Sequence, residues 1–188
     1  LQLGNGVRHK ILRDVSRGRL RPGQQPATPR EVYDLLLGER KKDATTAFAA
    51  RHLRHYSPMV RTWAARWLAD RSDKEAVDEL VTAARHADPR VRRAAYDAVS
   101  GYDNWRRPGR SRIPKEIVSR RFLGSIAKTL KNRNAAWWEI DGALFALGRC
   151  EPEDVRKHLP FIPRFLEHED WYLRDAAFWA LVGLGDTI

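Results

Sequence analysis

Two short clusters of aromatic and acidic residues are the part of this sequence whose residue types could carry chemistry. They are Trp137-Trp138-Glu139-Ile140-Asp141 and, 34 residues later, Trp171-Tyr172-Leu173-Arg174-Asp175. On a helix, Trp137 and Asp141 lie one turn apart and share a face, which makes that face a candidate site. Because the cluster occurs twice, we favour the structural alternative, in which Trp137 and Trp171 occupy equivalent positions and pack between layers.

A block of basic residues is the second candidate. Residues 105–133 carry ten Lys or Arg side chains against the single acid Glu116, whereas residues 134–188 carry five against ten acids. A basic block of this kind favours a polyanion, with a tryptophan available to stack on an exposed base. The candidate contacts are Trp105, Arg106, Arg107, Arg110, Arg112, Lys115, Arg120 and Arg121. The alternative is a solvated insertion whose acidic complement lies on a neighbouring segment.

Other classes of site have little support. No apolar run approaches the ~20 residues that span a bilayer. Cys150 is the only cysteine, and His52 and His55 have no acid or cysteine at metal-ligand spacing, while the other four histidines are scattered. We therefore expect no metal, no cofactor and no membrane span, and the compartment stays open.

Internal repetition explains most of the chain. The segments 60–68, 91–99 and 173–181 align without gaps, and each has apolar residues at i, i+3, i+4, i+7 and i+8. That spacing predicts the stripe of an amphipathic helix. A fourth copy at 140–147 aligns when Asp141 is set on Asp175, so the offsets are 31, 48 and 34 residues. The fold class predicted is all-α, an α-α superhelix of about four helix pairs.

The elements that position the clusters follow from this register. Ser57-Pro58, Asp88-Pro89 and Asp170 mark the starts of second helices. Partner helices are expected over about 42–54, 74–86, 114–131 and 152–167, the last one broken or kinked at Pro160 and Pro163. Residues 1–40 are predicted to form a basic arm and a short helix that begins at Thr28. Residues 41–188 then form the array, a single domain with a basic insertion loop at 101–113.

The segment 88–95, Asp-Pro-Arg-Val-Arg-Arg-Ala-Ala, resembles the second-helix motif of HEAT repeats, especially the bacterial subclass found in phycobilin-lyase-like proteins. In that family, the arginine one place after the first apolar residue bridges neighbouring repeats. The resemblance assigns this role to Arg61, Arg92 and Arg174, with Asp88 and Asp170 as further inter-repeat residues. Ile140 departs from the pattern, which puts regular stacking at the third pair in doubt.

The same alignment places Glu139 in the slot of Val60, Val91 and Leu173. A buried, unpaired acid is costly and would indicate a site with a shifted pKa. A one-residue slip that puts Trp138 in the apolar slot removes this cost, and we favour the slip.

The Trp137 cluster also resembles the alkylpurine DNA glycosylases built on HEAT-like repeats. This resemblance implies that Trp137 or Trp138 forms an aromatic wall, that Asp141 stabilises a developing positive charge, and that Arg174 contacts a phosphate. The cluster lies in the acidic segment of the chain. A groove that binds DNA is instead expected to be positively charged. The stretch 137–144 also resembles uncharacterised bacterial HEAT-containing proteins.

These patterns favour a non-catalytic protein-interaction or scaffold module, a HEAT-repeat segment of a larger bacterial protein. Its partner would be another protein or a neighbouring domain of the same chain. The alternative is nucleic-acid binding, with glycosylase chemistry as its strongest form, and a tetrapyrrole-attaching lyase subunit is a third reading.

Overall fold

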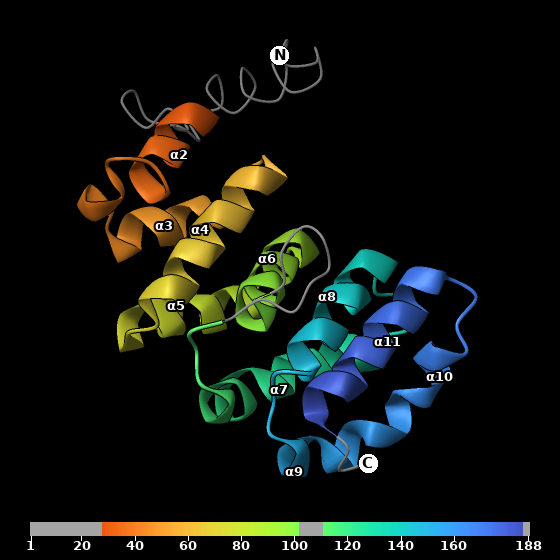
Figure 1. Cartoon of the computed structure of the whole chain (residues 1–188). Coiled ribbons are helices and arrows are strands. Elements are labelled where there is room, and N and C mark those ends of the chain that lie inside the picture. Colours follow the sequence, from red (N-terminus) through yellow and green to blue (C-terminus); the bar gives the residue numbers. More distant parts are fainter. Residues whose placement is uncertain (1–27, 102–110, 186–188) are drawn as a thin grey trace, which may run out of the picture.

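The computed structural model describes residues 28–101 and 111–185. Their regular structure is helical and is arranged as four successive pairs that follow one leading helix (Figure 1). The pairs are α3 (Thr46–His52) with α4 (Pro58–Arg71), α5 (Lys74–Ala84) with α6 (Pro89–Ser100), α7 (Lys115–Lys131) with α8 (Trp137–Leu147), and a broken first helix with α11 (Trp171–Leu184). The expected register of the second helices is confirmed, because all four begin at equivalent positions.

The first helix of the fourth pair is interrupted, as its prolines predict. It consists of α9 (Pro152–Val155), the 3₁₀ helix η2 (Arg156–Phe161) and α10 (Pro163–Leu166). Pro160 lies inside η2, and Pro163 begins α10. Proline lacks the amide hydrogen that a continuous helix needs at this point, so the chain bends around the second helix instead of running straight.

Capping differs among the second helices. Asp88 Oδ1 accepts a hydrogen bond from the Arg90 amide at 2.8 Å, and Asp170 Oδ1 accepts one from the Tyr172 amide at 2.9 Å. Both caps were expected. Ser57 was expected to cap α4, but its side chain makes no capping hydrogen bond. The start of α4 therefore depends on Pro58, whose fixed φ suits the first helical position.

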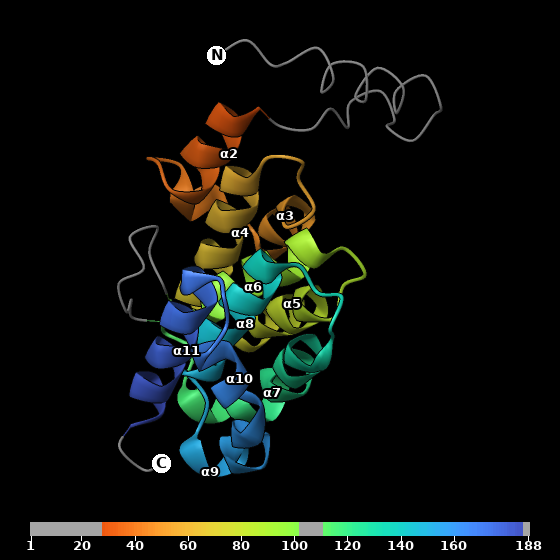
Figure 2. The same ribbon diagram turned by 90° about the vertical axis from the view of Figure 1, so that its right-hand side faces the viewer.

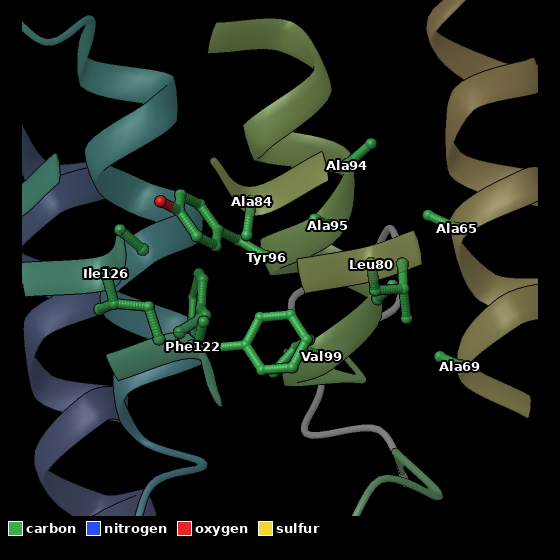
Figure 3. Packing of buried hydrophobic residues seen from close by; sticks show 14 of the residues in the cluster. Ala65, Ala69, Leu80, Ala84, Ala94, Ala95, Tyr96, Val99, Phe122 and Ile126 are labelled. Atoms are coloured by element: carbon green, nitrogen blue, oxygen red, sulfur yellow. The ribbon is translucent and has the colours of Figure 1, made fainter. Parts of the chain in front are cut away.

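The helices form two layers. The second helices α4, α6, α8 and α11 contact one another in that order, and α5 contacts α3 and α7 in the layer of first helices (Figures 1 and 2). The core lies between the layers. Figure 3 shows Tyr96 and Val99 of α6 beside Phe122 and Ile126 of α7, with the alanines of α4 and α6 allowing close approach.

The leading helix α2 (Pro29–Leu36) covers the N-terminal end of the array. Thr28 and Glu31 form a capping box, in which each side chain accepts a hydrogen bond from the other residue's amide. Val32 and Leu36 are buried, and the Tyr33 ring meets Trp63 of α4 edge-on at 5.4 Å between centroids. The 3₁₀ helix η1 (Lys41–Asp43) then leads into α3. The arm expected over residues 1–27 lies outside the described residues.

Among the helices of the described residues, none has the combination of length and apolar character that crossing a bilayer requires.

Candidate functional site

Trp137 and Trp171 occupy the first helical positions of α8 and α11, so they are equivalent, as the repeat predicts. The expectation that they pack between layers is wrong. Trp137 is 47% exposed and Trp171 is 53% exposed. The Tyr172 ring lies 5.5 Å from Trp137 and 3.8 Å from Trp171, measured between centroids. Three aromatic rings from two repeats thus form a surface cluster.

Asp141 is buried, in contrast to the exposed Trp137 one turn earlier. Its Oδ2 lies 3.0 Å from Arg93 Nη2, an ion pair that joins α8 to α6. Arg93 Nε also pairs with Asp97 Oδ1 at 2.6 Å, and Arg93 Nη1 donates to the Trp138 carbonyl oxygen. The absence of a side chain at Gly142 leaves room for Arg93, since a Cβ there would lie 2.4 Å from Arg93 Cδ. The carboxylate of Asp141 is therefore held in a contact between repeats.

The charges of this cluster depend on one another. Desolvation opposes the charged form of Arg93, but Asp97 and Asp141 more than offset it, so the pKa of Arg93 lies above its ordinary value. Burial raises the pKa of Asp97, and the Arg93 guanidinium acts in the opposite direction. Removing any one member would leave a poorly solvated charge behind.

Glu139 occupies the slot of Val60, Val91 and Leu173, so the slip that we favoured is wrong. The side chain is 2% exposed, and its Oε1 accepts from Arg92 Nε at 2.6 Å and from Thr129 Oγ1 at 3.3 Å. The hydrogen bond to Glu139, set against desolvation, raises the pKa of Arg92. Arg92, from the preceding repeat, therefore stabilises the buried carboxylate of Glu139.

A pocket of about 400 Å³ opens on the layer of second helices. Its lining comes from α4, α6 and α8 alone: Pro58, Arg61, Thr62, Arg90, Arg93, Ala94, Asp97 and Trp138. Three arginines and one aspartate line it, but Arg90 pairs with Asp88, and Arg93 pairs with Asp97 and Asp141. The partly buried Trp138 forms the apolar wall of the pocket. We call the side of α4, α6, α8 and α11 that carries this pocket the open face.

The chemical character of the open face changes along the array, as a comparison of equivalent repeat positions shows. Met59, Arg90, Trp138 and Tyr172 occupy equivalent positions on successive second helices. Arg90 is exposed, and its side chain donates hydrogen bonds to Oδ1 and Oδ2 of Asp88. The row therefore passes from a cationic group on α6 to aromatic rings on α8 and α11. Sequence reasoning singled out Trp138 but missed Arg90 and Arg93, although both lie in the segment with the HEAT-like motif.

The three arginines predicted to bridge neighbouring repeats share one contact with their own turns. Nη1 of Arg61, Arg92 and Arg174 donates to the carbonyl oxygens of the residues six and five places earlier, at 2.7–2.9 Å. We call this contact the arginine clasp. It ties the starts of α4, α6 and α11 to the turns before them. Arg92 is the member that also has a bond to the next pair, through Glu139.

Three histidines stabilise the same turns, and their role was not predicted from the sequence. His55, His86 and His168 lie six residues before the three arginines, and each Nδ1 accepts from the amide two residues later, at 3.0–3.1 Å. These histidines were regarded as scattered or tested as metal ligands. Their constant distance from the aligned arginines is the signal that identifies them. Within the described residues, no group of three His, Cys, Asp or Glu side chains could hold a metal ion.

The basic block is only partly described. Trp105, Arg106, Arg107 and Arg110 lie outside the described residues. Of the others, Arg121 pairs with Asp78 at 2.7 Å, Lys115 Nζ donates to the Gly183 carbonyl at 3.2 Å, and Arg112 Nη1 lies 3.4 Å from the Asp70 carbonyl. Arg120 is exposed on α7. Three of these four side chains thus have intramolecular partners, and none of them lines the pocket of the open face.

The family comparison agrees with this architecture. A family model described as HEAT repeats matches residues 39–108, the region of the first two helix pairs. These two pairs match the HEAT-repeat model, and the later pairs continue the same helical solenoid in the same register. A search of curated proteins gives no match.

Three solved structures that resemble the chain are of engineered or designed proteins. One is an engineered protein with 17% identity and a TM-score of 0.47, which covers 74% of this chain; the match spans 62% of that protein's length. Two are designed armadillo repeat proteins, one of them in complex with the peptide (KR)4. Each has 15% identity and a TM-score of 0.47, and the match covers 82% of this chain and 68% of the other.

Proposed function

We propose that this HEAT-repeat solenoid is a non-catalytic protein-interaction module that binds its partner along the open face. The observation that carries the proposal is the row Arg90, Trp138 and Tyr172, which presents a cation and then aromatic rings beside the pocket of about 400 Å³. Arginine and aromatic side chains are the groups that most often dominate binding energy at protein interfaces.

The row also indicates the chemistry of the partner. An extended segment of another protein would place a carboxylate near Arg90 and apolar side chains near Trp138 and Tyr172. The second helices hold these groups in fixed register, so little conformational entropy is lost on binding. The same face would serve a neighbouring domain if the chain is a segment of a larger bacterial protein.

The contacts beneath the open face favour binding over catalysis. A carboxylate that stabilises a developing positive charge has to face the substrate. Asp141 instead faces Arg93, and Glu139 faces Arg92. Arg174, the phosphate contact of the glycosylase reading, donates to the carbonyls of its own turn. Base-excision chemistry would require these pairs to open.

The test is selection of a displayed peptide library on the full chain, followed by fluorescence anisotropy of the selected peptides. We expect peptides that combine Asp or Glu with apolar residues, and at least about tenfold weaker binding to Trp138→Ala and to Arg90→Ala. Arg120→Ala is the matched control, because Arg120 is exposed on α7, in the other layer.

Two results would contradict the proposal. One is equal binding of the selected peptides to all three variants. The other is tight binding of a 20-base-pair DNA that falls along a steep log-salt line, since that outcome belongs to nucleic-acid recognition through the basic block.

A further inference from the structure

A second pocket, of about 300 Å³, lies where the second and third helix pairs meet. Its lining comes from the end of α5 and the turn at 85–87, from α6, from the last two turns of α7 and from the start of α8. Figure 2 shows α5 and α7 side by side in the layer of first helices. Among the described residues, this pocket and the one on the open face share none: Arg92 of α6 lines the former, and its neighbour Arg93 lines the latter. We call the second pocket the junction pocket.

An ion pair in the junction pocket fixes the direction of a guanidinium group. Glu139 is buried, and its Oε1 accepts hydrogen bonds from Arg92 Nε at 2.6 Å and from Thr129 Oγ1 at 3.3 Å. Arg92 Nη1 donates to the carbonyl oxygens of His86 and Ala87. Within the described residues no hydrogen bond uses Arg92 Nη2, and this side chain is 21% exposed. The guanidinium is therefore held in place and still has the two N–H groups of Nη2 for a ligand.

Two further cations line the junction pocket, and they come from different elements. Arg85 follows the last residue of α5, and Lys128 lies in the last turn of α7. Both side chains are exposed, and neither forms an ion pair with an acid of the described residues. Because the charges of Arg92 and Glu139 cancel, Arg85 and Lys128 leave the pocket with two positive charges that no carboxylate of the array neutralises.

This arrangement matches a phosphate monoester better than a carboxylate. A phosphate monoester carries about −1.5 to −2 charge at pH 7 and has three strong acceptor oxygens, enough for two cations and one guanidinium edge. A carboxylate has a single charge and would leave one cation unmatched. The methyl groups of Ala84 and Ala87 add apolar lining, which suits the carbon chain of an ester. A volume of about 300 Å³ is at the lower limit for small-ligand sites, so one phosphorylated side chain fits it better than a nucleotide does.

We propose that the junction pocket binds a phosphorylated serine or threonine side chain of a partner protein. Arg85 and Lys128 neutralise the phosphate, and Arg92 Nη2 donates hydrogen bonds to one of its oxygens. The ligand then contacts the second pair through Arg85 and the third pair through Lys128, so it bridges two repeats. This inference does not depend on the open face.

The probe is N-acetyl-O-phosphoserine amide, which carries no charge besides its phosphate, titrated into the full chain and followed by NMR of the backbone amides. We expect saturable shifts at residues 85–87 and 125–132. Arg85→Ala and Lys128→Ala should each weaken binding at least about tenfold, because each removes a charge-assisted hydrogen bond. Arg120→Ala is the matched control and should bind as the parent chain does, since it removes the same charge from an exposed site of α7 outside the pocket. N-acetyl-aspartate amide, the carboxylate analogue, should bind at least about tenfold more weakly than the phosphoserine probe.

Three results would overturn the proposal. Equal losses in Arg120→Ala and Lys128→Ala would indicate a diffuse basic surface. Inorganic phosphate that binds as tightly as the phosphoserine probe would make the free ion the occupant, and displacement of the probe by a DNA duplex without terminal phosphates would make it a nucleic acid. The open face is tested separately: Trp138→Ala should leave binding of the phosphoserine probe unchanged, and Lys128→Ala should leave binding of the selected peptides unchanged.

Discussion

Arg92 joins two roles in one side chain, because it clasps its own turn and neutralises Glu139 of the next pair. We expect Arg92→Ala to lower the free energy of unfolding by about 3–5 kcal/mol, the usual cost of leaving a buried charge without its partner. Urea denaturation measures the change. Arg174→Ala is the matched control, since it removes the same clasp at an exposed site. An equal cost for both variants would show that the pair with Glu139 contributes nothing.

Asp88 links stability to pH through its cap. Hydrogen bonds from the Arg90 side chain, followed by one from the Arg90 amide, outweigh partial burial and lower the pKa of Asp88 to about 2. A carboxyl with a depressed folded-state pKa stabilises the fold above its ordinary pKa of 3.8, and that contribution is lost as pH falls towards 2. Thermal unfolding from pH 5 to pH 2 should show this loss, with Asp88→Asn responding less.

The asparagine variant keeps a capping oxygen and removes the titrating group, so its lower sensitivity isolates the charge. Asp88→Ala removes both and should cost about 0.5–2 kcal/mol at neutral pH. Parallel pH profiles for the asparagine variant and the parent chain would contradict the assignment.

At the scale of elements, α8 and α11 approach each other closely through two glycines. A Cβ on Gly183 would lie 2.5 Å from the Gly148 carbonyl oxygen, a main-chain atom that cannot move by itself. Gly183→Ala should therefore destabilise the fold, although alanine is the better helix former. The matched control is Gly124→Ala in α7, where nothing lies within 4 Å of the added methyl group.

Gly124→Ala should stabilise the protein by about 0.4–1 kcal/mol. Both effects are measured by chemical denaturation under the same conditions. If Gly183→Ala stabilises as much as Gly124→Ala does, the close approach of α8 and α11 is not needed for the packing of the last pair.

The sequence predicts elements well wherever a local signal marks them. Thr28 and Glu31 identify the start of α2, and Pro160 and Pro163 identify the break in the fourth pair, because capping and proline geometry act within a few residues. The burial of Glu139 was not predicted, since the arginine that neutralises it lies 47 residues away in the sequence. The exposure of Trp137 was missed because aromatic periodicity does not distinguish a core position from a surface cluster.

For the whole molecule, each pair is stabilised by its neighbours, so stability should vary along the array. The helix α6 has a second helix on each side, whereas α11 contacts α8 and has an exposed outer face. Native-state hydrogen exchange should therefore be at least about tenfold slower in α6 than in α11. Equal protection of the two helices would mean that the array opens as one cooperative unit.

The candidate site was harder to predict than the architecture. Trp138 could be named because aromatic clusters are visible in a sequence, but the pocket beside it needs Arg61, Arg90 and Arg93 from two other helices. Their convergence depends on the stacking angle between pairs, which no local pattern encodes. Alignment of the repeats predicts part of this arrangement, since it places Arg90, Trp138 and Tyr172 at equivalent positions in one row.

The arginine clasp has a mechanical consequence for the array. It stiffens the turns before α4, α6 and α11, but the side chain of Ile140 has no hydrogen-bond donor that could make the same contact with the turn at 132–136. Elastic bending of the superhelix should therefore concentrate at the junction of α7 and α8, while the other junctions stay rigid. Trp138 lies at the start of α8, next to this turn, so a ligand in the pocket would hold the start of α8 against α4 and α6 and limit the bending there.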